Sequence, residues 1–251
     1  MGDTATAFVQ LRIHGRLYPP SGPVKIRVPK GRVYPSDMVP AAGELADIVV
    51  SAAVDQVTAQ GKKISCRAGC GACCRQLVPL AEPEVYHLRG VVEQMAAERR
   101  AEIMRRFSEA QEQLQAAGML DRLLQSREMG SRERHELGLR YFQLGIACPF
   151  LENESCSIYS VRPVECREYL VTSPPEHCGN PSKETVDCVR LEARVSQIIG
   201  RLADADRAAG PRWVPLILAM RRSASDEVPQ RPRLGHVMLE QLVRGVAGAG
   251  K

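Results

Sequence analysis

A chain of 251 residues is long enough to bury a substantial core, and its 44% hydrophobic and 25% charged side chains are typical of a globular protein. Aromatic side chains are only 4% of the total, which disfavours a surface that stacks bases or an aromatic ligand cage. The formal net charge of +5 is modest, so nucleic acid is not an expected partner.

The sequence predicts a cytoplasmic location and no membrane partner. The N-terminus lacks the basic and apolar regions of a signal peptide, and the longest apolar run, at 214–220, is too short to cross a bilayer. In a reducing compartment, clustered cysteines are more often metal ligands than disulfides. The odd count of nine cysteines and the adjacent pair Cys73-Cys74 also fit a disulfide framework poorly.

The N-terminal segment is expected to form a small β-hairpin. Residues 8–14 and 24–28 alternate apolar and polar side chains, and the proline-rich loop at 19–23 can turn the chain between them. The apolar face of this hairpin carries Val9, Leu11, Ile13, Val24, Ile26 and Val28.

Helical spacing of apolar residues predicts that most of the remaining chain is helical. The predicted stretches are 42–60, 84–128, 133–146 (as helix or loop), 186–208 and 234–247. Pro83 suits the first turn of the second stretch, and Gly118 is expected to divide that stretch into two helices. Residues 223–232 have the composition of a linker.

The segment Cys66-Arg-Ala-Gly-Cys70-Gly-Ala-Cys73-Cys74 places four cysteines within nine residues. Short loops can bring thiolates with this spacing to one cation, and the intervening glycines allow the positive φ that such a loop needs. An unreactive cluster of buried cysteines is the alternative, but it does not account for the glycines. The spacing therefore predicts metal ligation.

A second set of cysteines is spread over the later part of the chain: Cys148, Cys156, Cys166, Cys178 and Cys188. Their irregular gaps cannot form a site locally, so the fold must bring these sulfurs together. Pro163 should help to aim Cys166, and the pair Arg162 and Arg167 is predicted to lie near the thiolates, where guanidinium groups lower cysteine pKa values. A histidine ligand is not expected, and His177, which precedes Cys178, is the only histidine placed where it could be one.

The two cysteine segments together resemble the YkgJ-type cysteine-cluster family, described as a zinc- or iron-chelating domain. The resemblance covers about residues 62–200 and includes Cys148-Pro-Phe-Leu and Cys156-Ser-Ile-Tyr-x2-Arg-Pro-x2-Cys166. It implies metal binding through about eight cysteines. The first gap, of three residues, is longer than in many relatives, and either Cys178 or Cys188 is spare.

Zinc, iron and an iron–sulfur cluster all remain open as the cofactor. Zinc accepts four thiolates, and eight thiolates could hold two ions; iron–sulfur clusters are also held by four cysteines. Eight thiolates and two divalent ions would bring the loaded chain close to neutrality, which further weakens the case for nucleic acid.

An enzymatic role is the alternative function. The C-x3-C-x2-C spacing matches radical-SAM clusters, but Ala72 replaces the usual aromatic residue and no βα alternation follows. Flagellin lysine N-methylases are similar to the cysteine-cluster family, so a cluster-dependent protein-modifying activity stays open. No catalytic residue is evident.

The predicted fold class is α+β, predominantly helical, with a small N-terminal β-hairpin and a cysteine-rich core organised by metal. We divide the chain into a β-hairpin extension at 1–40, a metal-binding domain at 41–208, and a C-terminal extension with a linker and short helix at 209–251. The two extensions lie outside the family resemblance and are candidates for docking a protein partner.

Overall fold

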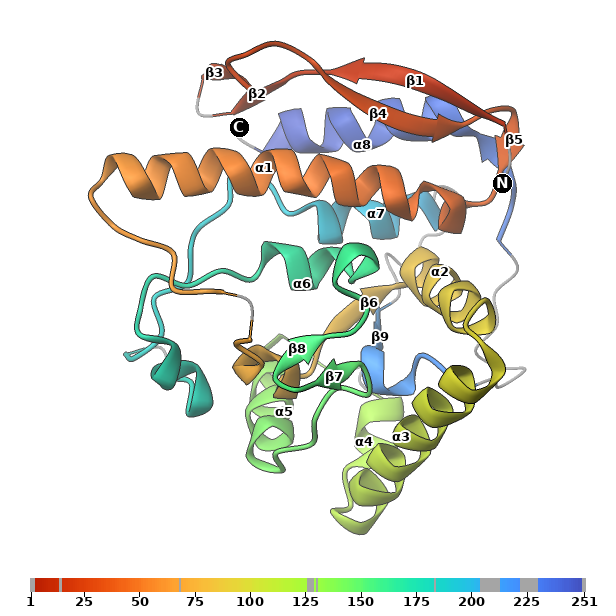
Figure 1. Cartoon of the computed structure of the whole chain (residues 1–251), viewed down its shortest axis with the longest axis vertical. Coiled ribbons are helices and arrows are strands. Elements are labelled where there is room, and N and C mark those ends of the chain that lie inside the picture. The colour runs from red at the N-terminus through yellow and green to blue at the C-terminus, as the bar shows by residue number, and fades with distance from the viewer. Residues whose placement is uncertain are drawn as a thin grey trace.

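The computed structural model is dominated by helices, with short antiparallel strand pairs, as the sequence predicts (Figure 1). It describes residues 3–13, 15–67, 69–125, 129, 131–182, 184–203, 213–221 and 230–249. Within these ranges, no helix combines the length and apolar character that crossing a bilayer requires. The helices are α1 (Val39–Ala59), α2 (Glu82–Glu93), α3 (Ala97–Ala116), α4 (Leu120–Leu124), α5 (Ser131–Gln143), α6 (Val164–Glu168), α7 (Val195–Ala203) and α8 (Gly235–Ala249).

The strands form five antiparallel pairs: β1 (Thr4–Val9) with β4 (Val24–Pro29), β2 (Leu11–Ile13) with β3 (Arg16–Tyr18), β5 (Arg32–Val33) with β10 (Arg233–Leu234), β6 (Pro79–Ala81) with β9 (Trp213–Pro215), and β7 (Leu151–Glu152) with β8 (Ser155–Cys156). Five short 3₁₀ turns complete the described elements: η1 (Pro35–Met38), η2 (Ala72–Arg75), η3 (Tyr159–Val161), η4 (Pro175–Gly179) and η5 (Leu216–Leu218).

The N-terminal hairpin forms as predicted, but its first strand is divided. Val9 pairs with Val24 at the end of β1, and the chain then makes a second small hairpin in which Ile13 pairs with Arg16. The positive φ of Gly15, +74°, permits this tight reversal. The single strand expected at 8–14 is therefore wrong, although the predicted apolar face is buried, with Val24 half-buried.

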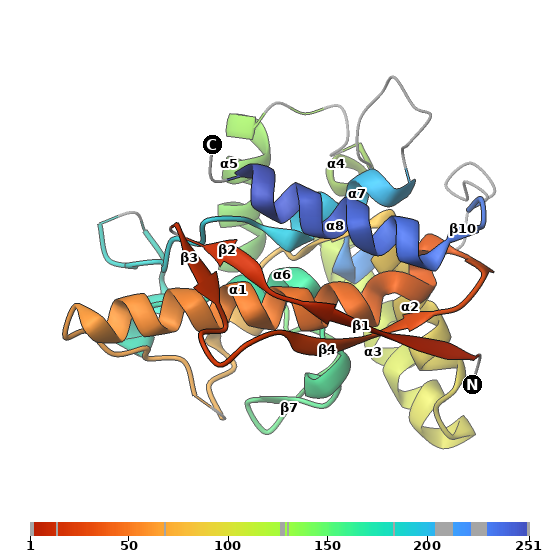
Figure 2. The same cartoon turned by 90° about the horizontal axis from the view of Figure 1, so that it is seen from above.

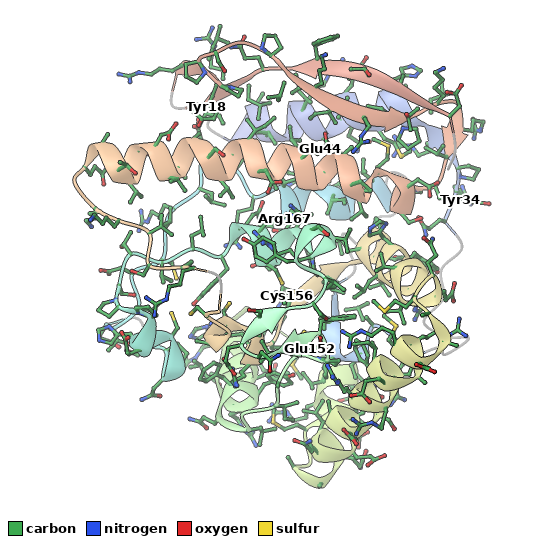
Figure 3. All side chains as sticks on the ribbon, in the orientation of Figure 1. Tyr18, Tyr34, Glu44, Glu152, Cys156 and Arg167 are labelled. Atoms are coloured by element: carbon green, nitrogen blue, oxygen red, sulfur yellow. The ribbon has the colours of Figure 1, made fainter. Side chains whose placement is uncertain are left out.

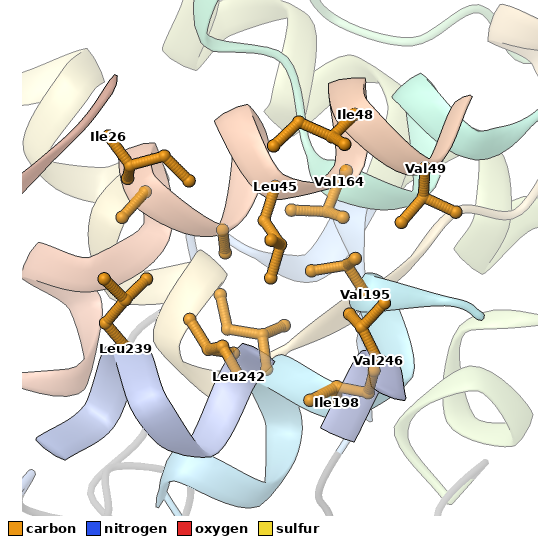
Figure 4. Close-up of a cluster of buried hydrophobic side chains, with 14 of the residues drawn as sticks. Ile26, Leu45, Ile48, Val49, Val164, Val195, Ile198, Leu239, Leu242 and Val246 are labelled. Atoms are coloured by element: carbon orange, nitrogen blue, oxygen red, sulfur yellow. The ribbon is translucent and has the colours of Figure 1, made fainter. Parts of the chain in front are cut away.

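Helix α1 is the centre of the larger apolar core. It packs against β4, α6, α7 and α8, and Leu45 is fully buried at the middle of the cluster (Figure 4). Its predicted apolar positions Ile48, Val49, Ala52 and Ala53 are buried, and Val57 is half-buried. The 3.6-residue periodicity identified this helix, because its buried side faces several neighbours and excludes charged residues.

The N-terminal hairpin and the C-terminal helix pack against each other and against α1. Seen from above, the hairpin crosses α1 with α8 alongside it (Figure 2). A Cβ on Gly235 would lie 2.2 Å from the Pro29 carbonyl oxygen, so the two segments approach as closely as backbone allows. Their apolar faces are thus part of one core that also includes α1 and α7.

The long helical stretch predicted at 84–128 is three helices, α2, α3 and α4. Pro83 stands in the first turn of α2, and Gly118, with φ +64°, lies between α3 and α4, both as predicted. The break at 94–96 was not predicted. Two smaller apolar clusters hold these helices, one around Phe107 and Phe150 and one around Leu114 and Leu137.

The helix predicted at 186–208 begins only at Val195. The preceding residues are extended, because Thr172 donates to the Asp187 carbonyl and Val189 donates to the Leu170 carbonyl. Residues 204–208 of this prediction, and 223–229 of the predicted linker, lie outside the described residues.

Candidate metal centre

The first cysteine segment connects α1 to β6 and contacts a distant part of the chain. The Ser65 N–H donates to the Val171 carbonyl at 2.9 Å, which places Cys66 beside that residue. Gly69 has φ +80°, a conformation that favours glycine, and the chain then enters η2, which carries Cys73 and Cys74. The glycine-rich spacing therefore produces the curled loop that the sequence predicts.

The second set of cysteines reaches the same region from separate elements. The Cys148 N–H donates to the Cys74 carbonyl at 2.7 Å, which joins the two cysteine segments directly. Cys156 lies on β8, at the end of a short hairpin, and Cys166 lies on α6. The remaining two are Cys178 on η4, which packs against η2, and Cys188, which forms a β-bridge with Val171.

Four cysteines form what we call the outer group: Cys66, Cys70, Cys178 and Cys188. Burial raises the pKa of the Cys66 thiol, and the thiols of Cys73, Cys70 and Cys188 raise it further. Burial also raises the pKa of Cys178 to about 11, with contributions from the other three members and from Cys73. Electrostatic interaction of this kind weakens with distance, so the four thiols lie in one region, although no three of them converge on one point among the described residues.

Three further cysteines form what we call the inner group: Cys148, Cys156 and Cys166. Burial raises the pKa of Cys148 to about 12, and the Cys156 thiol adds to the effect. The pKa of Cys166 is also raised by burial first and then by Cys148, Cys73 and Cys156. Cys148 and Cys156 pack against the apolar cluster around Phe150, so this group lies on a hydrophobic base.

Cys73 lies between the two groups and interacts with both of them. A hydrogen bond with Cys74 is the largest of the effects that raise its own pKa, followed by burial. All nine cysteines are free thiols. Within the described ranges, no three Cys, His, Asp or Glu side chains converge in a geometry that would hold an ion as they stand. Metal binding would therefore have to draw these thiols closer together.

The side chain of Arg162 provides an observation independent of the cysteines. Its Nε and Nη1 atoms are buried and find no hydrogen-bond partner in the described part of the chain. The guanidinium lies 3.7 Å from the ring centroid of Tyr159, and its charge lowers the pKa values of Cys73 and Cys156 against the effect of burial. Unpaired buried donors beside thiols fit a centre that becomes negatively charged when thiolates bind a metal.

Arg167 has a different role from the one predicted. Its Nη1 donates to both carboxylate oxygens of Asp47, at 3.2 and 2.9 Å, and its Nη2 donates to the Ser160 carbonyl at 2.6 Å. It lies between α1 and α6, above the hairpin that carries Cys156 (Figure 3). A Cβ on Gly43 would lie 3.3 Å from Arg167 Nε, so α1 leaves little room beside this side chain. Arg167 joins the cysteine segment to the core.

Arg75 and Glu154 form a contact between the two cysteine segments that the sequence analysis missed. Arg75 donates to both Glu154 carboxylate oxygens, at 3.1 and 2.7 Å, and to the Gly71 carbonyl at 3.0 Å. The Gly71 N–H in turn donates to Glu154 and, with Arg75, lowers the pKa of that carboxyl. This contact ties the first cysteine loop to the turn between β7 and β8.

Two buried carboxylates, also missed, hold the helices next to the inner group. Glu84 accepts from the N–H groups of Ala81, at 3.0 Å, and Val164, at 2.8 Å, so it binds the starts of both α2 and α6. Glu168 accepts from the Val195 N–H at 2.5 Å and from the Ser196 hydroxyl at 2.6 Å. Only Glu84 left a sequence signal, because an acid three residues after a helix N-cap is typical of a capping box.

A surface hollow of about 670 Å³ opens beside Cys70. Its walls come from the first cysteine loop, η2, α5, the β7–β8 turn and η4, and include Gly69, Gly71, Glu176 and Asn180. One ring nitrogen of His177, Nδ1, lies 2.7 Å from the Thr185 carbonyl oxygen, which leaves Nε2 as its only nitrogen available to a metal.

Residues 65–188 match the family model CxxCxxCC, whose description is "Putative zinc- or iron-chelating domain". The matched segment contains all nine cysteines and supports metal binding by this part of the chain. The match bears out the resemblance to a zinc- or iron-chelating domain, and no named relative supports the narrower YkgJ-type assignment. No curated protein and no solved structure matches the chain.

Proposed function

We propose that this protein binds zinc or iron through cysteine thiolates arranged as an inner and an outer group. The main support for this proposal is that two cysteine segments, remote in sequence, meet where the Cys148 N–H donates to the Cys74 carbonyl. Cys74 is the fourth ligand that we assign to the inner group, beside Cys148, Cys156 and Cys166. With Cys74, the inner group offers four thiolates to one ion, as the outer group does, and Cys73 lies between the two groups.

The donor set fits both metals that the family description names. Four thiolates suit tetrahedral zinc, and four thiolates also hold iron–sulfur clusters, where hydrogen bonds to sulfur tune the centre. The buried Arg162 would offset negative charge in either case. We also infer a reducing, cytoplasmic location, since all nine thiols are free and would persist there.

Elemental analysis of protein purified without oxygen and without added chelator tests this function. We expect about two equivalents of zinc plus iron per chain if both groups are filled. A colourless zinc protein would reject the iron–sulfur form, and a brown protein with charge-transfer absorption would select it. A content well below one equivalent, in a folded sample, would overturn metal binding.

The enzymatic alternative has no supporting observation. Neither the comparisons nor the described residues favour a methylase-like activity, and we do not propose one.

A further inference from the structure

The outer and inner cysteine groups differ in their access to solvent. Cys66 and Cys188 of the outer group are exposed, Cys70 is half-buried and Cys178 is buried, whereas the four members of the inner group are all half-buried. Cys148 and Cys156 pack against an apolar cluster that includes Phe150. An ion held by the inner group would have the apolar cluster on one side, and an ion held by the outer group would be open to water on the side of Cys66 and Cys188.

The two groups also differ in how their backbone is held. Helix α6, which carries Cys166, is fixed by Glu84 at its first residue and by Arg167 through Asp47. The outer group depends on extended segments instead, where Ser65 and Cys188 both pair with Val171. A ligand on an extended surface segment can move away from an ion at lower cost than a ligand on a packed helix.

The hollow beside Cys70 gives a second molecule access to the outer group. It is bordered by the glycines of the first cysteine loop and, on the other side, by Gly179 and Asn180 of the segment that carries Cys178. Several of these residues have no side chain beyond hydrogen, so a ligand atom could approach the Cys70 sulfur closely.

We propose that the outer group is an exchangeable metal site, which gives up or receives its ion through a thiol ligand that enters this hollow, while the inner group retains its ion. This inference rests on the proposed metal-binding function. With an ion bound, each exchange would replace one outer cysteine thiolate by the incoming thiolate. The released cysteine would take up the proton that the incoming thiol loses, so no oxidant or reductant would be needed.

Metal release from the loaded protein tests the proposal. The protein is mixed with excess 4-(2-pyridylazo)resorcinol if it contains zinc, or with ferrozine if it contains iron, with and without millimolar glutathione. We expect two phases of equal amplitude, of which only the faster is accelerated by glutathione. A single phase for the whole metal content would overturn the proposal while leaving metal binding intact, and absence of metal would overturn the proposed function first.

Variants assign the two phases to the two groups. Cys188→Ser should remove the fast phase and about half the metal, whereas Cys156→Ser should affect the slow phase.

Asn180→Trp tests entry through the hollow. It should narrow the hollow and slow the fast phase at least several-fold at unchanged metal content. Gln113→Trp, at an exposed position on α3, is its control. An unchanged fast phase in Asn180→Trp would exclude entry through the hollow.

Alkylation of the wild-type protein gives a readout that does not depend on any variant folding. Iodoacetamide is added after the fast phase, and the modified cysteines are located by peptide mass spectrometry. We expect Cys66 and Cys188 to be labelled first. Early labelling of Cys148 or Cys166 would reverse the assignment and overturn the proposal. The rate of the fast phase is also measured with free cysteine, with glutathione and with a cysteine-containing peptide. A rate increased only by the two small thiols identifies a small thiol as the exchange partner, and a rate increased most by the peptide identifies a protein thiol.

Discussion

The core around α1 and the cysteine centre are built in different ways. The core joins β4, α1, α7 and α8 through continuous apolar contact and needs no other component. The cysteine centre is made of loops, 3₁₀ turns and two-residue strands, held by individual hydrogen bonds and ion pairs around thiols and the Arg162 guanidinium, of which Nε and Nη1 are buried without a hydrogen-bond partner among the described residues. From this difference we expect the core to fold without metal and the order of the cysteine centre to depend on it.

The largest expected effect is on the core. Leu45→Ala removes a fully buried side chain and should lower the free energy of unfolding by about 2–5 kcal/mol, because a cavity remains that the packed helices cannot fill. Urea unfolding of metal-free protein measures this change, with Gln56→Ala, at an exposed position on the same helix, as control. A loss of less than about 1 kcal/mol would show that the core does not carry the fold.

The sequence predicts the core better than the centre for the same reason. Periodicity identified α1, α8 and the apolar face of the hairpin, since each buries one regular stripe against several neighbours. It failed at 186–194, where pairing with residues 170–172 keeps the chain extended, and at Gly15, where a tight turn divides the first strand. In both places the conformation is decided by backbone hydrogen bonds and turn geometry, which the pattern of apolar residues does not predict.

For the candidate site, the sequence predicts which residues matter but not their arrangement. The sequence singles out all nine cysteines as candidate ligands, but no three of them converge on one point among the described residues. The prediction for Arg162 agrees with its position beside Cys73 and Cys156, whereas Arg167 binds Asp47 instead. The Glu154 contact could not be predicted, because it joins residues far apart in sequence through a turn of ordinary composition.

Substitution of Arg162 is expected to have the next largest effect. It should stabilise the metal-free protein and weaken the binding of metal. Arg162→Met removes two buried N–H groups without a hydrogen-bond partner among the described residues and keeps an apolar side chain against Tyr159, so the metal-free protein should gain up to about 3 kcal/mol of stability. The same change should weaken metal binding at least tenfold, because the thiolates lose their counter-charge. Chelator competition and unfolding of the metal-free protein measure the two effects. Destabilisation of the metal-free form would show that this cation is satisfied there.

The buried Glu84 carboxyl, which caps two helices, should make the stability of the protein depend on pH. Burial raises the pKa of its carboxyl to about 7, above the usual value of 4.5, so the folded protein binds more protons than the unfolded chain between these pH values. Stability should therefore fall as the pH rises from about 4.5 to 7, and level off above that. Glu84→Gln should remove this part of the pH dependence.

The same variant should also lose about 1–3 kcal/mol at low pH, because the amide cannot accept from both the Ala81 and Val164 N–H groups. Unfolding of metal-free protein in urea at several pH values, with wild type measured in parallel, gives both quantities. An identical pH slope in the two proteins would show that Glu84 is not the titrating group.

The smallest effect on stability is expected at the contact between the two cysteine segments. The Arg75–Glu154 pair is partly exposed, at 32% and 51% of its side chains, so Glu154→Gln should change the free energy of unfolding only slightly. Its local effect should be larger, because Gly71 loses its carboxylate acceptor and the first cysteine loop is released from the β7–β8 turn. We therefore expect faster amide hydrogen exchange at 69–75 and a several-fold loss of metal affinity, with the exchange rates of α1 unchanged.

Glu136→Gln, which breaks an exposed pair with Arg132 on α5, is the matched control. Equal exchange at 69–75 in both variants would mean that the cysteine loop is held by its other contacts, and the separation between a self-sufficient core and a centre held by single contacts would then be less sharp.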